Sequence, residues 1–325
     1  MHRDMVTPVF LTVDTEFAWR HHRAGLNLKA IYDRSIEPMG VGLSYQLNVL
    51  RRHGLKATFF IDPMPADIFG IDPVRRMVEA VLEAGQEVQL HCHPHWQQAR
   101  VDDRGAAHDR FQLYEYDRDE QQVVLARATE LLMAAGAPRP VAFRAGSYAA
   151  NDDTLAALAA LGFTYDSSHN GAEPKHSRIT LPARQVAPVT WPSGSPGIIE
   201  VPVTVIEDRP GHLRTFQICA LSTEESCDAL EHAAASGHAA VTIVSHSFEL
   251  ANRSATRANA VHVRRFEALC EILHQMASVL PTRHFAEMPA LRLGQEDAVL
   301  GPDSLRTRWR QAEQLWSNLV EERRA

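Results

Sequence analysis

The sequence contains few cysteines, and no spacing that would join them. Its four cysteines, Cys92, Cys219, Cys227 and Cys270, include no CxxC pair among 325 residues. Disulfide-stapled secreted domains and cysteine-rich zinc modules need denser and more regular patterns. We therefore expect four free thiols in a protein that works in a reducing compartment.

Long apolar runs and an excess of positive charge are also missing. No apolar segment approaches the roughly 20 residues that cross a bilayer, and the first residues do not follow the pattern of a signal peptide. Acidic residues outnumber Lys and Arg by 40 to 33, which gives a net charge of −7. This charge argues against a nucleic-acid or anionic-membrane partner. We expect a cytoplasmic protein without a membrane span.

The chain does contain a repeated alternation of strand and helix patterns. Strands are predicted at 9–14, 56–61, 87–92, 140–145, 198–206 and 240–246, with a weaker one at 283–288. Helices are predicted at 43–53, 74–84, 120–135, 154–161, 223–236, 259–278 and 302–324. This alternation predicts an α/β fold with a parallel sheet, either open or closed into a barrel.

The same pattern predicts one domain, residues 1–300, with residues 301–325 as a C-terminal helix packed on it. Two long loops, 97–119 and 167–197, interrupt the alternation and are candidates for lids or substrate walls. The apolar side chains expected to pack the C-terminal helix are Leu305, Trp309, Leu315, Trp316 and Leu319.

Polar side chains gather where the predicted strands end, which is the edge where α/β folds place their active sites. The first strand ends in Asp14-Thr15-Glu16, and alternation along an extended chain points Asp14 and Glu16 the same way. Two carboxylates would then face one site, although solvated or capping acids would give the same pattern.

The third strand ends in three histidines, His91, His93 and His95, separated by Cys92 and Pro94. We expect Pro94 to end the strand, so that His91 and His95 converge across a turn as ligands of one ion. Neutral imidazoles with a carboxylate and an open position form the usual hydrolytic zinc site.

Three further polar residues follow other predicted strands: Arg144, Asp166 and His246. Each alone would most often be structural, as a hydrogen-bonded histidine, an ion-paired arginine or a capping acid. Together at one edge of one sheet, they favour a catalytic site.

The ordered motifs resemble the polysaccharide deacetylase (NodB-homology) family of metal-dependent hydrolases. The matching segments are TVDTE (12–16), GQEVQLHCHPHW (85–96), FRAGSY (143–148), YDSS (165–168) and VSHSFEL (244–250). The resemblance implies a distorted, incomplete (β/α) barrel of about seven parallel strands. The third motif departs from the family's Arg-x-Pro-Tyr, which implies an altered groove wall.

The resemblance also implies the metal ligands. His91 and His95 match the two histidine ligands, but Thr15 stands where the family has a second aspartate ligand. A ligand role for Glu16 replaces that aspartate and leaves Asp14 as the base, while the reverse assignment stays open. Zinc is the expected ion.

By the same resemblance, Arg144 pairs with Asp14, and His246 protonates the leaving amine with Asp166 as its acidic neighbour. The expected reaction is removal of an N-acetyl group from an amino sugar, with a small-molecule or oligosaccharide substrate such as a nucleotide-sugar. The alternatives are an allantoinase-like hydrolase of a cyclic amide and a sugar-binding relative without activity. The oligomeric state stays open. The side chains expected to touch the substrate are His93, Trp96 and Tyr148.

Overall fold

A curled sheet forms the centre of the molecule in the computed structural model, which describes residues 6–101, 110–191 and 197–322. Seven of its strands run parallel in the spatial order β10, β1, β2, β3, β4, β5, β7, and β6 adds an antiparallel edge. The strands are β1 (Val9–Thr15), β2 (Thr58–Ile61), β3 (Glu87–Cys92), β4 (Ala142–Ala145), β5 (Tyr165–Asp166), β6 (Val189–Thr190), β7 (Ile199–Glu200) and β10 (Val241–His246).

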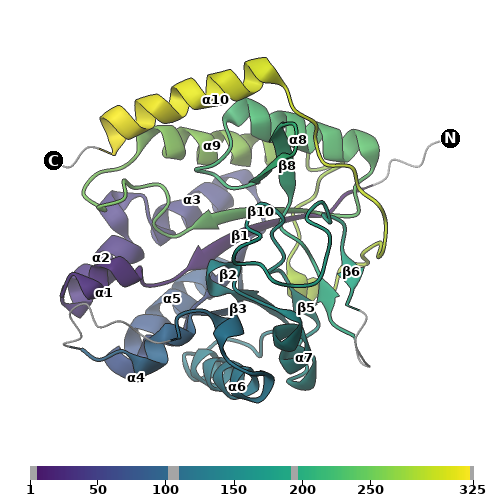
Figure 1. Ribbon diagram of the computed structural model, residues 1–325. Coiled ribbons are helices and arrows are strands. Elements are labelled where there is room, and N and C mark those ends of the chain that lie inside the picture. The colour runs from purple at the N-terminus through teal and green to yellow at the C-terminus, as the bar shows by residue number, and fades with distance from the viewer. Residues whose placement is uncertain (1–5, 102–109, 192–196, 323–325) are drawn as a thin grey trace.

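The sheet is strongly curled but open, so the fold is a half-barrel, and the prediction of an incomplete (β/α) barrel is confirmed (Figure 1). Strands β8 (Val205–Arg209) and β9 (His212–Thr215) form a separate hairpin. The helices lie around the strands and are α1 (Trp19–Arg23), α2 (Leu28–Ser35), α3 (Leu43–His53), α4 (Ala66–Phe69), α5 (Asp72–Glu83), α6 (Arg118–Ala134), α7 (Asp152–Ala160), α8 (Thr223–Ser236), α9 (Ala260–Gln275) and α10 (Ser304–Trp316).

Apolar side chains point to both faces of the central strands, as is typical of a parallel sheet whose two faces are both covered. Along β1, Val9, Leu11 and Val13 join the main apolar cluster, while Phe10 joins a second one. In that second cluster the ring of Phe285 stacks on Phe10 with centroids 4.3 Å apart. The segment predicted as a weak strand at 283–288 is a 3₁₀ turn that packs this phenylalanine, so that prediction was wrong.

The predicted strand at 198–206 divides between two sheets, as β7 in the central sheet and β8 in the hairpin. Helix α3 has the predicted bounds and ends at Gly54, which is left-handed with φ 64°. The cysteines of the described chain are free, as expected. No helix in the described ranges is both long and apolar enough to cross a bilayer.

Helix α10 packs through charged groups rather than apolar ones. The five apolar side chains expected to hold it, from Leu305 to Leu319, are 51–75% exposed, so that prediction was wrong. Arg310 is buried instead, and it donates to Asp208 at 2.7 Å and to Glu225 at 3.0 Å. A buried arginine that bridges two carboxylates joins α10 to β8 and α8.

Replacing Arg310 by alanine would leave Asp208 and Glu225 buried without this cation. Breaking a buried ion pair from one side typically costs about 3–5 kcal/mol. We expect Arg310→Ala to lower the free energy of unfolding in urea by an amount of that order. The matched control is Arg308→Ala, an exposed arginine on the same helix. Equal losses in the two variants would contradict this account of how α10 is held.

Candidate functional site

The carboxyl ends of the parallel strands place the polar residues side by side. In the register of β1 with β10, Asp14 is opposite His246, and in that of β3 with β4, His91 is opposite Arg144. The order β10, β1, β2, β3, β4 therefore puts these four side chains on one rim of the half-barrel.

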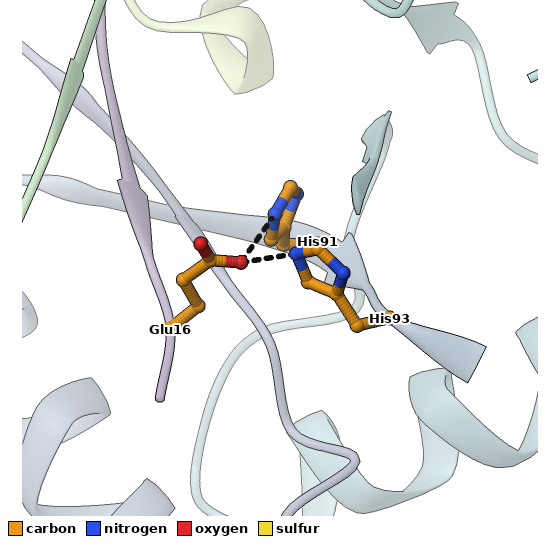
Figure 2. A group of neighbouring side chains, drawn as sticks. All are labelled: Glu16, His91 and His93. Carbon is orange, nitrogen blue, oxygen red and sulfur yellow. Dashed lines mark hydrogen bonds and ion pairs between the residues drawn. The ribbon is translucent and has the colours of Figure 1, made fainter. Parts of the chain in front are cut away.

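Three side chains on this rim could hold a metal ion: Glu16, His91 and His93. Their ligand atoms all lie within 4.8 Å of one another. The Nε2 atoms of both histidines contact the same oxygen of Glu16, at 3.2 Å for His91 (Figure 2). A carboxylate and two imidazoles that converge in this way match the donor set of a catalytic zinc site.

Backbone contacts orient His91 for this role. Its Nδ1 donates to the carbonyl oxygen of Arg144 at 2.8 Å, which directs Nε2 toward Glu16 and the place an ion would take. Burial by itself would raise the pKa of Glu16, but the charges and hydrogen bonds of His93 and His91 outweigh it and hold the pKa well below its usual range. Glu16 is therefore an ionised ligand candidate.

His95, the second histidine ligand expected from the sequence, lies in an aromatic cluster. Pro94 ends the strand and begins a 3₁₀ turn (Pro94–Gln98), which turns the side chain of His95 away. Its ring stacks on Phe111 with centroids 4.0 Å apart and meets Trp19 at 4.6 Å. His93 thus occupies the position in the ligand group that we expected for His95.

His93, expected to touch the substrate, reaches Glu16 because residue 146 is glycine. A Cβ atom there would lie 2.4 Å from ring atoms of His93, closer than any stable contact. The next residues, Ser147 and Tyr148, have left-handed φ values of 55° and 58°, which are uncommon outside glycine. This strained turn packs against a ligand candidate, as strained backbone often does at functional sites.

The two other residues expected to touch the substrate lie in different surroundings. Trp96 is 1% exposed and packs against Trp19, so it offers no surface to a substrate, which corrects the prediction. The hydroxyl oxygen of Tyr148 is buried and has no hydrogen-bond partner among the described residues. Burial, together with the charge of Asp14, raises the pKa of Tyr148 and keeps that hydroxyl a proton donor.

Arg144 is fully buried and pairs with Asp14, as predicted. Its Nη1 donates to Asp14 Oδ1 at 2.8 Å and to the hydroxyl of Thr12 at 2.7 Å. Its Nε and Nη2 donate to the carbonyl and the hydroxyl of Ser167, each at 3.0 Å. The other carboxylate oxygen of Asp14 faces Nε2 of His246 at 4.0 Å. Asp14 is thus held by Arg144 through Oδ1 and faces His246 through Oδ2.

The acidic neighbour of His246 is Glu249, whose carboxylate lies 3.4 Å from Nδ1. Burial lowers the pKa of His246, but Glu249, with Asp14 and Glu16, outweighs it and raises the pKa to about 9. The prediction that Asp166 fills this role was wrong, because Asp166 instead accepts the hydroxyl of Ser168 at 2.8 Å.

Sequence reasoning missed two carboxylates at this rim, Glu249 and Asp62. Glu249 follows His246 by three residues, and Asp62 directly follows the apolar strand β2, so both had a positional signal. Asp62 is fully buried, and one of its oxygens has no hydrogen-bond partner among the described residues. Burial raises the pKa of Asp62 to about 7, despite the opposing charge of His93.

The site therefore combines a metal-ligand group, a fixed carboxylate and a histidine held protonated, all on one rim. A cavity of about 1020 Å³ opens beside His246 and Glu249. A carboxylate base and an imidazolium acid on either side of a polarised carbonyl can hydrolyse an amide.

Comparison with known proteins finds a family match over part of the chain. Residues 42–165 match the family model described as polysaccharide deacetylase. This span includes the histidine segment and Arg144, whereas Asp14, Glu16 and His246 lie outside it. A peptidoglycan deacetylase-like protein, FGM2, from Gibberella zeae is 30% identical over 147 residues. That match covers 45% of this chain and only 38% of the relative's length.

Solved structures share the fold at low sequence identity. A protein assigned as a polysaccharide deacetylase from Mycobacterium smegmatis has a TM-score of 0.54 at 18% identity, covering 97% of this chain and 93% of its own. A 4-alpha-glucanotransferase from Thermococcus litoralis has a TM-score of 0.55 at 9% identity, covering 92% of this chain and 42% of its own. At these identities the likeness establishes the fold alone.

The contact between residue 146 and His93 can be tested by adding one methyl group. We expect Gly146→Ala to push the His93 ring away from Glu16 and to weaken zinc binding, by the 10–100-fold typical of a disturbed ligand support. Isothermal titration of metal-free protein with zinc measures the change.

Gly301→Ala is the control, since a Cβ at residue 301 meets no atom within 4 Å. Unchanged zinc affinity in Gly146→Ala, with the protein folded, would remove His93 from the ligand group.

Proposed function

Because residues 42–165 match the polysaccharide deacetylase family model, we propose that the chain belongs to this family and removes an N-acetyl group from an amino sugar by hydrolysis. The observation that carries this proposal is the convergence of Glu16, His91 and His93 next to the Asp14–Arg144 pair. We also propose that the substrate is a small amino sugar or oligosaccharide and that the protein works in the cytoplasm, as expected from the sequence.

The donor set fits a divalent ion, and zinc is the ion that two imidazoles and one carboxylate favour. Glu16, His91 and His93 would hold it. When bound, such an ion supplies Lewis acidity, which polarises an acyl carbonyl and makes nearby water more acidic. Thr15 does not compete as a ligand, since its hydroxyl lies 3.3 Å from the carbonyl of Val13. Glu16 thus compensates for the aspartate that this chain lacks.

Asp14 takes the proton of the attacking water. Arg144 holds Oδ1 at 2.8 Å, which leaves Oδ2 directed toward His246. Because Arg144 also bonds Thr12 and Ser167, Asp14 cannot rotate freely away from the reacting atoms. A base fixed in this way needs little reorganisation during the reaction.

His246 donates a proton to the departing amine. An amine leaves poorly unless it is protonated, and the imidazolium held by Glu249 provides that proton. Glu249 is held in turn, because it accepts from the side-chain amide of Gln217 and the backbone of Cys219, both at 2.9 Å. The acid and the base therefore stand on the neighbouring strands β10 and β1.

Asp14→Asn tests the base. The amide keeps the shape of the side chain but cannot accept the proton, so we expect turnover of an N-acetylated amino sugar to fall by about 10²–10⁴-fold. Zinc content should stay at the wild-type level. The control is Asp119→Asn on the exposed surface of α6. Turnover within twofold of the wild type would contradict the role of Asp14.

Glu249→Gln tests the acid. Glu249 raises the pKa of His246, so its removal should lower that pKa and deprotonate His246 at a lower pH. We expect the alkaline limb of the kcat/KM profile, which for wild type falls as pH rises through about 9, to move to lower pH.

The exposed variant Glu224→Gln on α8 is the control for this profile. An alkaline limb that does not move in Glu249→Gln would mean that a group other than His246 supplies the proton.

A panel of acetylated amino sugars and cyclic amides separates the proposal from the alternatives. Cleavage of the cyclic amides alone would favour the allantoinase-like reading. If the protein retains no zinc and cleaves no compound of the panel, the result would favour a sugar-binding protein without activity.

A further inference from the structure

The cavity beside His246 is rich in cationic side chains that the proposed reaction does not use. Its wall includes Arg20, Arg34 and Arg253 together with two further histidines, His21 and His262. Asp14, Glu16, His91 and His93 are not part of this wall, so the cavity lies on the His246 side of the site.

The acids in this wall already have partners. Glu249 is committed to His246, and Glu322 accepts from the backbone of Arg253 at 2.7 Å and from Asn259 at 2.9 Å. In the described part of the chain, no carboxylate forms an ion pair with the guanidinium of Arg34 or Arg253. Arg34 and Arg253 therefore bring positive charge to the wall that no carboxylate of the described residues pairs with.

Arg20 is already held in place. Its Nε donates to the carbonyl of Arg253 at 3.1 Å, and its guanidinium lies 4.9 Å from the ring centre of Phe248. These contacts use one of its five N–H groups and leave the rest for a ligand. A guanidinium fixed before binding loses little conformational entropy when it takes up an anion.

The two histidines add buried polar atoms to the same wall. His21 and His262 are 5% and 7% exposed, and the Nε2 atom of each is buried without a hydrogen-bond partner among the described residues. Nδ1 of His262 donates to the carbonyl of Glu249 at 2.8 Å, which leaves Nε2 facing the cavity side of the ring without a partner among the described residues. Buried polar atoms without partners are uncommon and indicate a place that a polar ligand can fill.

The position of the cavity indicates what enters it. His246 protonates the departing amine, so the sugar attached to that amine extends past His246 and into the cavity. A volume of about 1020 Å³ is at the upper end of the usual range for small-molecule sites, which is larger than a single neutral sugar needs.

We propose that this cavity binds an anionic group, a phosphate or a carboxylate, attached to the amino sugar, and that Arg34 and Arg253 bind it with Arg20 beside them. This inference rests on the proposed function, since it names the substrate class for the same site. Guanidinium groups suit both anions because their paired N–H groups match the oxygens of either one.

Binding and turnover are measured for three probes: N-acetylglucosamine, its 1-phosphate and N-acetylmuramic acid. The first is neutral, the second carries a phosphate and the third a carboxylate. We expect the wild type to bind at least one anionic sugar more tightly than the neutral one. The double variant Arg34→Gln/Arg253→Gln should lose about 10–100-fold in affinity for that sugar and keep its affinity for the neutral one.

The control is Arg118→Gln, which replaces an exposed arginine on α6. Helix α6 lies at the opposite end of the molecule from α10, whose Gln314 lines the cavity (Figure 1). The control removes one positive charge away from the cavity, where the double variant removes two, and should leave all affinities unchanged. Higher salt should weaken binding of the anionic sugar to the wild type more than to the double variant.

The outcomes separate this inference from the proposed function. Equal binding of neutral and anionic sugars, or anion binding that the double variant keeps, overturns the inference even if deacetylation occurs. Anion binding that depends on Arg34 and Arg253 supports the anion site even if no sugar is deacetylated. In that last case the proposed function fails and the cavity is a binding site for another reaction.

Discussion

The candidate site depends on one buried arginine. Arg144 is fully enclosed, and its side chain holds Asp14 while its own carbonyl oxygen accepts from His91. One residue on β4 therefore positions a carboxylate on β1 and an imidazole on β3. Three more of its N–H groups donate to Thr12 and Ser167, which offsets much of the free-energy cost of burying the charge. Asp14 and the ligand group keep their spacing because Arg144 contacts both, through its side chain and its backbone carbonyl.

Two positions that differ from the motifs the sequence resembles lie at the same ligand group. Thr15 removes the expected aspartate, and Glu16 provides a carboxylate one residue later, with a longer side chain that reaches His91 and His93. Gly146 lies in the third motif, where the family's Arg-x-Pro-Tyr pattern is not kept, and the ring of His93 occupies the space that a side chain at residue 146 would need. The two changes therefore act on the same ligand group, one through its carboxylate and the other through its second imidazole.

The fold and the rim of the site follow from local patterns in the sequence. The alternation of strand and helix patterns predicted a parallel α/β sheet, the family resemblance implied its incomplete barrel, and strand alternation placed Asp14 and Glu16 on one side. The missed contacts depend on three-dimensional packing. Nothing in the sequence shows that Pro94 turns His95 into a cluster with Trp19 and Phe111, or that Glu249 folds back onto His246. The packing of helix α10 was also predicted wrongly. Its apolar side chains suggested an apolar contact, but the buried ion pairs of Arg310 join the helix to the domain.

The most direct test of the account is the position of zinc in crystals grown with the ion, located by anomalous scattering. We expect one ion about 2.0–2.2 Å from a Glu16 oxygen and from Nε2 of both His91 and His93. Asp14 and His246 should lie nearby without binding it. An ion bound by His95 or by Asp14 in place of His93 or Glu16 would contradict the ligand group, and an empty rim would contradict the metal-dependent reaction itself.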